Sequence, residues 1–286
     1  MNEQIIQWFP GHMAKTNRKI KESLSLVDAV AEIADARVPI SSRNPELSEI
    51  ISGKPRLILL NKCDIADGAS NKKWVEYYKK SGVKALLVDC KSGKGVNGFV
   101  PAVKELLKDK IEYYNSKGMT GRALRIMVVG IPNVGKSSFI NRMAKSSGAP
   151  VQDRPGVTRA NQWYRINKQL DLLDTPGVLW PKFEDQTVGK HLSFTGAIKD
   201  SVVDCETIAA YLLDFLKTDY PGALTARYKV ENPQDFEPYD LLEEIGRKRG
   251  FVAKGGVPDT ERAANMLLDE FREGKIGKIT IEKPEF

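Results

Sequence analysis

The sequence is poor in cysteine and has no long apolar run. Its 286 residues include three cysteines, Cys63, Cys90 and Cys205, without C-x-x-C spacing or the even count of a disulfide framework, which indicates a reducing cytoplasm. Apolar stretches such as residues 57–60 and 126–129 fall well short of the roughly 18 residues that a membrane span requires. The N-terminus lacks the charged and apolar regions of a signal peptide. We therefore expect a soluble cytoplasmic protein with no membrane partner.

The chain has fewer acidic than basic residues, and this imbalance differs between its two parts. The chain has 44 Lys and Arg against 37 Asp and Glu. Residues 1–195 hold 31 basic and 19 acidic residues, a net +12, whereas residues 196–286 hold 13 and 18, a net −5. A basic balance favours a polyanionic partner through counterion release, and the split places that attraction on the first part of the chain. A merely soluble basic protein is the alternative that charge alone leaves open.

The apolar pattern predicts two domains. From about residue 14 to 180, short apolar runs alternate with helical patterns, which is typical of βαβ units in a doubly wound, mostly parallel sheet. From Gly196 the pattern changes to helices, one over residues 204–216 and one whose expected N-cap is Asp259 or Thr260. We predict an α/β domain over residues 1–190 and a small all-helical domain over residues 191–286. Strands are expected over 29–33, 56–60, 85–88, 124–129, 162–166 and 170–173, and helices over 14–26, 73–81, 98–117, from the glycine loop to 145, 204–216 and 260–272.

Residues 130–137, Gly-Ile-Pro-Asn-Val-Gly-Lys-Ser, fit the template of a phosphate-binding P-loop. They follow a predicted strand and open a predicted helix, as this motif requires. Glycine lets backbone N–H groups surround the phosphates, Lys136 should reach the β- and γ-phosphates, and Ser137 should place its hydroxyl on Mg²⁺. A glycine turn without nucleotide is the alternative reading.

Two further segments suit the γ-phosphate. Asp174-Thr-Pro-Gly177 follows a predicted strand, so its carboxylate can approach Mg²⁺ through water while the Gly177 amide reaches the γ-phosphate. Thr158, between the P-loop and this motif, is the natural switch threonine that completes the metal shell only when the γ-phosphate is present. An ordinary loop hydroxyl is the alternative for Thr158.

Asn61-Lys-Cys-Asp64, at a strand end, looks like the guanine-reading N-K-x-D motif. The Asp64 carboxylate can accept from the guanine N1–H and exocyclic amine, a pair of donors that adenine lacks, while the Lys62 stem packs across the base. Asp89 and Cys90 follow the next strand, where the Cys90 N–H can donate to guanine O6. The residues expected at the nucleotide are Asn61, Lys62, Cys63, Asp64, Asp89, Cys90, Asn133, Val134, Gly135, Lys136, Ser137, Ser138, Thr158 and Gly177.

The order of these motifs is reversed relative to ordinary GTPases, because the base-reading motif precedes the P-loop. The order is a clean rotation of the usual one. The glycine-containing basic stretch at 117–122 is where a rotation would have joined the original ends, since a polar flexible bridge is the simplest connection.

The group that activates water is less obvious. Many GTPases carry a glutamine after D-x-x-G, but Val178 and Leu179 stand here. One candidate is Asn133, because in GTPases with this G-x-x-N-x-G-K-S loop the asparagine helps hold K⁺ near the phosphates. The other is His12, although a lone histidine is more often packed or solvated. His191, expected in the loop beyond the switch, is a weaker candidate.

Taken together, these motifs resemble the circularly permuted GTPases and, within them, the ribosome biogenesis GTPase A family. The resemblance implies a GTPase that binds the late precursor of the large ribosomal subunit and its rRNA, is stimulated by it, and leaves after hydrolysis. It implies that His12 orients the water and that the C-terminal domain binds RNA. The residues that carry it are 8–15, 35–39, 42–45, 61–64, 130–138, 174–177 with 179–182, and 196–200.

The sequence departs from the family pattern at two places, and it leaves two other functions open. Residues 89–91, Asp-Cys-Lys, stand where many GTPases have Ser-Ala-Lys. The acidic C-terminal part suits RNA only through a local patch, for which residues 247–249 with 254–256 are the choice, against a solvated helix end with a glycine C-cap. A P-loop small-molecule kinase and a GTP-binding scaffold with little hydrolysis are the competing functions. We expect a monomer.

Overall fold

A computed structural model describes residues 12–146, 161–181, 183–253 and 255–285. The chain forms two compact units. One consists of residues 9–181 and 282–286, and the other of residues 1–8 and 182–281. The described residues contain no helix that is both long and apolar enough to cross a membrane.

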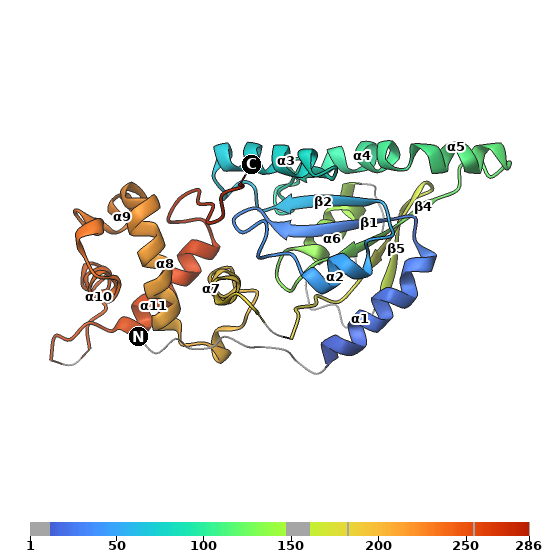
Figure 1. The fold of residues 1–286 in the computed structure, drawn as a ribbon. Coiled ribbons are helices and arrows are strands. Elements are labelled where there is room, and N and C mark those ends of the chain that lie inside the picture. The colour runs from blue at the N-terminus through green and yellow to red at the C-terminus, as the bar shows by residue number, and fades with distance from the viewer. Residues whose placement is uncertain (1–11, 147–160, 182, 254, 286) are drawn as a thin grey trace. The chain divides into compact units, whose positions relative to one another are not determined.

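The first unit, the nucleotide unit, is built on a six-stranded sheet in the order β3-β2-β1-β4-β6-β5 (Figure 1). Every neighbouring pair is parallel except β5 with β6. The predicted doubly wound, mostly parallel sheet is confirmed. The strands are β1 (Ala29–Asp35), β2 (Arg56–Asn61), β3 (Lys84–Leu87), β4 (Leu124–Val129), β5 (Gln162–Asn167) and β6 (Leu170–Asp174).

The burial of the strands explains their sequences. All positions of β1 are buried, as are all but the first of β2, because these inner strands are covered on both faces and therefore read as continuous apolar runs. The edge strand β5 is mostly exposed. The buried carboxylate Glu32 in β1 is paired by the Arg43 guanidinium, whose Nε and Nη2 donate at 3.0 Å each.

Two helices of the nucleotide unit begin after a side-chain cap, which is Asn44 for one and Asp67 for the other. The Asp67 carboxylate accepts from Ser70 N, so α3 starts at Gly68 rather than at the predicted residue 73. The single helix predicted over 98–117 is wrong, because Leu107 leaves helical geometry between α4 and α5, which Figure 1 shows running in nearly the same direction. The helices are α1 (His12–Ser23), α2 (Pro45–Ile50), α3 (Gly68–Lys80), α4 (Phe99–Leu106), α5 (Lys108–Ser116) and α6 (Lys136–Ser146), with 3-10 turns at Leu24–Leu26 and Val96–Gly98.

The second unit, the helical unit, is all-helical in its described elements. Asp259 caps a helix as predicted, and Asp204, where the sequence predicted only the start of a helix, is a cap as well. Both carboxylates accept from N–H groups of the first turn. The predicted boundary at residue 190 falls inside α7, whereas the compact units divide at 181 and 182. The helices are α7 (Gln186–Phe194), α8 (Cys205–Asp219), α9 (Pro221–Tyr228), α10 (Pro238–Lys248) and α11 (Thr260–Arg272), with 3-10 turns at Asp200–Val202 and Pro233–Asp235.

Candidate nucleotide-binding site

The sheet brings the predicted motifs to one edge. Residues 61–64 follow β2, residues 89–91 follow β3, residues 130–137 follow β4, and residues 174–177 follow β6. These four strands run parallel. Their carboxyl ends therefore meet at the edge where open α/β sheets bind ligands.

The glycine loop is folded so tightly that side chains are excluded. Gly135 has φ +104°, and a Cβ there would lie 2.3 Å from Asn61 Nδ2. Gly130 has φ +149°, and its Cβ would lie 2.5 Å from the Ile33 carbonyl oxygen. Asn133 also takes a positive φ of 61°, a conformation that asparagine tolerates better than most residues. Glycine at 130 and 135 is thus dictated by the close approach of neighbouring groups.

Lys136 lies within this loop, where its side chain is buried. Its Nζ donates to the carbonyl oxygens of Ile131 at 2.8 Å and Gly130 at 3.1 Å. Burial lowers the pKa of Lys136 to about 8, and the Asp174 carboxylate partly opposes that shift. A buried ammonium with few compensating charges favours an anion beside it.

The 174–177 motif lies against the glycine loop. Thr175 Oγ1 donates to the Val128 carbonyl at 2.8 Å, which fixes the motif on β4. A Cβ on Gly177 would lie 2.8 Å from Pro132 N and 2.9 Å from Lys136 Nζ. Gly177 therefore forms one wall of a cradle that any other residue would fill.

The donor set suits a hard divalent cation. Asp174, at the end of β6, is 1% exposed, and Ser137 is at the start of α6. A carboxylate and a hydroxyl beside a phosphate-binding loop are oxygen donors of the kind that Mg²⁺ takes together with phosphate oxygens and water. The third predicted ligand, Thr158, lies outside the described residues.

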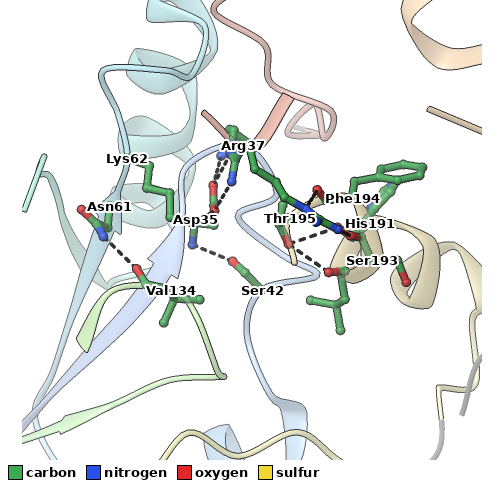
Figure 2. Close-up of polar contacts among 12 residues, drawn as sticks. Asp35, Arg37, Ser42, Asn61, Lys62, Val134, His191, Ser193, Phe194 and Thr195 are labelled. Carbon is green, nitrogen blue, oxygen red and sulfur yellow. Dashed lines mark hydrogen bonds and ion pairs between the residues drawn. The ribbon is translucent and has the colours of Figure 1, made fainter. Parts of the chain in front are cut away.

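Asn61 joins the base-reading motif to both neighbouring loops, and Figure 2 shows its bond to Val134. Its Nδ2 donates to the Val134 carbonyl at 2.7 Å, and its Oδ1 accepts from Cys90 N at 3.0 Å. The Cys90 N–H, predicted to donate to guanine O6, therefore donates to Asn61 in this structure. An O6 contact from Cys90 would require that bond to be shared or broken.

Lys62 is held by residues to which sequence reasoning assigned no role. Its Nζ lies 2.9 Å from Asp35 Oδ2, and Arg37 donates to the same carboxylate from Nε at 2.9 Å and Nη2 at 2.8 Å (Figure 2). Burial opposes ionisation of Asp35, but the Arg37 and Lys62 charges outweigh it and hold the Asp35 pKa well below its usual range. The sequence signal for this pair was an Asp at the end of a buried strand followed two residues later by an Arg.

The remaining residues expected near the base differ in whether they bond to their own loop or are exposed. Asp89 accepts from Lys91 N at 2.8 Å and Ser92 N at 3.2 Å, so its carboxylate caps its own loop. Burial opposes a charge on Asp89, but these bonds lower its pKa. Cys63 is half-buried, and Asp64 is exposed at the end of the motif. Asp64 is therefore the carboxylate accessible to a base.

The structure describes the candidate water-activating residues to different extents. His12 is the first residue of α1, and its side chain is outside the part of the chain that the structure describes. His191 is wrongly predicted in a loop: it lies in α7, a helix capped by Asp185 whose carboxylate accepts from Thr187 N. Val178 and Leu179 are fully buried.

Comparison with known proteins agrees with this geometry. A family model described as a 50S ribosome-binding GTPase matches residues 125–246, beginning at β4 and leaving the base-reading motif upstream. Ribosome biogenesis GTPase A of Bacillus cereus is 48% identical over 98% of this chain and 95% of that protein. The Priestia megaterium protein of the same name is 50% identical over 98% of this chain and 97% of its own.

A solved structure agrees as well. GNP-bound YlqF from T. maritima superposes with a TM-score of 0.66 at 29% identity, covering 95% of this chain and 99% of that one. Together with the base-reading motif upstream of the P-loop, relatives of this identity along nearly the whole chain establish the assignment. The chain belongs to the ribosome biogenesis GTPase A family of circularly permuted GTPases, and its activity is the hydrolysis of GTP.

Proposed function

We propose that this protein is a hydrolytic switch in ribosome assembly, binding the precursor of the large ribosomal subunit with GTP and leaving after hydrolysis. The observation that carries the proposal is the near full-length match to relatives named ribosome biogenesis GTPase A, together with the 50S-binding family model. The protein would act in the cytoplasm as a monomer, with precursor rRNA as its polyanionic partner.

At the phosphate end, the chain supplies positive charge and backbone donors. Lys136 leaves its bonds to the loop carbonyls and turns to the β- and γ-phosphates, where an anion restores its full protonation. Ser137, Asp174 and Thr158 would hold Mg²⁺, which supplies charge that offsets the negative charge developing on the phosphates. The Gly177 N–H would contact the γ-phosphate and so report its presence.

At the base end, selectivity for guanine comes from Asp64. Its exposed carboxylate accepts from the two guanine donors, while the stem of Lys62 lies across the ring. Asn61 keeps the base-reading and phosphate-binding loops at a constant separation, because its single side chain bonds to both neighbouring loops. The base and phosphate ends are thus positioned together.

Water activation is assigned to His12. The side chains after Gly177 are buried and apolar, so neither Val178 nor Leu179 can orient water. The bound particle would position the His12 imidazole beside the attacking water, which would make hydrolysis depend on the particle. Asn133 is exposed in the glycine loop, where its oxygen could serve K⁺ as a source of additional charge.

The test is GTP turnover with and without purified precursor large subunits, each in K⁺ and in Na⁺. We expect His12→Ala to lower the particle-stimulated rate by about 100-fold, the usual scale for a general base or water-orienting group, while GTP affinity is unchanged. His191→Ala is the matched control, since it removes the chain's other histidine. Equal stimulated rates in His12→Ala and wild type would remove His12 from catalysis, and no stimulation in wild type would favour the scaffold.

A further inference from the structure

The segment between β1 and α2, residues 36–44, consists of successive hydrogen-bonded turns whose N–H groups have an unusual acceptor. Within it, Val38 N donates to the Asp35 carbonyl at 3.0 Å, Ser42 N donates to the Val38 carbonyl at 2.9 Å, and Arg43 N to the Ile40 carbonyl at 2.9 Å. The N–H groups of Ile40 and Ser41 donate to an acceptor outside this segment, as unpaired backbone donors require.

That acceptor comes from the far end of the chain. The Glu282 carboxylate accepts from Ile40 N at 2.5 Å and from Ser41 N at 2.9 Å, and also from the Ser41 hydroxyl. The Glu282 carbonyl accepts from Trp74 Nε1 of α3 at 3.0 Å. Glu282 follows directly on the helical unit, which ends at Ile281, but belongs to the nucleotide unit. A charged capping bond is about twice as strong as a neutral one.

The capped turn connects to the residue expected at the base. Ser42 Oγ accepts from Asp35 N at 2.9 Å, and Asp35 holds Lys62 Nζ through Oδ2 at 2.9 Å (Figure 2). Lys62 has a positive φ of 62°, a strained conformation that surrounding contacts must maintain. Asp35 and Arg37 are both about 1% exposed, so this network is buried and its geometry is sensitive to the turn.

We propose that Glu282 is a positioning residue for guanine binding: by capping the 36–44 turn it sets Asp35, and through Asp35 it sets Lys62 against the base. The proposal rests on the proposed role of Lys62 at the guanine. The chain enters the helical unit after the γ-phosphate motif and leaves it at Glu282. A rearrangement of the helical unit that pulls on residue 282 would therefore loosen the bound nucleotide.

The test measures dissociation of a fluorescent GDP analogue from the full-length protein. Glu282→Ala should accelerate dissociation about fivefold or more, the lower end of usual coupling between sites. Glu282→Gln should lie between that variant and wild type, because a neutral amide oxygen accepts weaker bonds. Glu285→Ala, which removes an exposed carboxylate of the same tail, should behave as wild type.

The route through Lys62 is tested by repeating the change in a Lys62→Met background, which keeps the stem but removes the ammonium. There Glu282→Ala should alter dissociation by less than about twofold, because the two changes act on one interaction. An equal acceleration in both backgrounds, or none in either, would overturn the proposal. A lowered unfolding temperature with unchanged dissociation would also overturn it, leaving Glu282 a purely structural residue.

Hydrogen exchange provides an independent measurement that needs no nucleotide. The Asp35 amide, which donates to Ser42 Oγ, should exchange faster in Glu282→Ala than in Glu285→Ala, and equal protection would contradict the proposal. If Lys62→Ala, which removes the stem as well as the ammonium, binds GDP as wild type does, the base assignment fails. That result is distinct from failure of the Glu282 cap, which would show as unchanged exchange and dissociation.

Discussion

The nucleotide unit and the helical unit use polar side chains in different ways. In the nucleotide unit, Asn61 and Thr175 donate to backbone carbonyls of a neighbouring loop and strand, and Lys136 donates to carbonyls of its own loop. These bonds hold the strand-end loops in place. In the helical unit, Arg272 and Glu270 join one helix to another. The first arrangement fixes backbone groups around a ligand, whereas the second fixes a packed bundle.

The helical unit also compensates much of its own charge. Arg272 donates to both Asp200 oxygens at 2.6 and 2.8 Å, and to the Ser193 carbonyl at 2.9 Å. In the patch proposed for RNA, Arg247 pairs with Glu243 at 2.8 Å and Arg249 lies 3.5 Å from Glu270. An RNA phosphate at residues 247–249 would have to compete with these acidic partners, and the RNA site stays a prediction.

The largest effect should come from the phosphate end. Lys136→Ala removes the buried ammonium, and we expect GTP affinity to fall by at least about 100-fold, because bonds to a charged phosphate contribute most to binding. Lys145→Ala, an exposed lysine on the same helix, is the control. Calorimetric titration measures both. Unchanged affinity in Lys136→Ala would mean that this loop does not bind phosphate.

A change at the base end should alter selectivity. Asp64→Asn should lower GTP affinity about 50-fold, since a carboxylate facing two donors becomes an amide with one acceptor. The variant should prefer xanthosine triphosphate, whose base carries an oxygen in place of the exocyclic amine. Competition between the two nucleotides decides the matter, and retained GTP preference would contradict the assignment of Asp64.

The glycine loop should be intolerant of a single methyl group. Gly135→Ala places a Cβ 2.3 Å from Asn61 Nδ2 at a φ of +104°, and we expect about 2 kcal/mol of lost stability. Gly53→Ala is the control, because a Cβ there meets nothing within 4 Å. Urea unfolding of the two variants measures the difference. Equal stability would show that Asn61 can leave its bond to Val134 at little cost.

The smallest effect on nucleotide binding should follow from Arg272→Met. Loss of its bonds to Asp200 and Ser193 should destabilise the helical unit by about 2 kcal/mol, while GDP affinity stays at the wild-type value. Denaturation of one preparation measures the loss of stability, and nucleotide titration of the same preparation measures the GDP affinity. Arg247→Met, which changes an exposed arginine, is the control. A parallel loss of GDP affinity would break the contrast between the two units.

Much of the fold could be predicted from local sequence patterns. The strand at 124–129 matches its prediction because a buried apolar run before a glycine loop is a local signal. Helix starts at Asp204 and Asp259 follow from capping chemistry within a few residues. The break at Leu107 was missed because no Gly or Pro marks it, and α7 was missed although Asp185 offered a local capping signal for it.

The motifs, their permuted order and the alternation of strands and helices could all be predicted from the sequence, since each depends on residues close together in the chain. Only the tertiary structure decided that Asn61 bonds to two loops, that Asp35 holds Lys62, and that Glu282 caps a turn 241 residues earlier. Side-chain bonds over such separations leave no periodic trace, because their partners meet only after the sheet and the tail have folded.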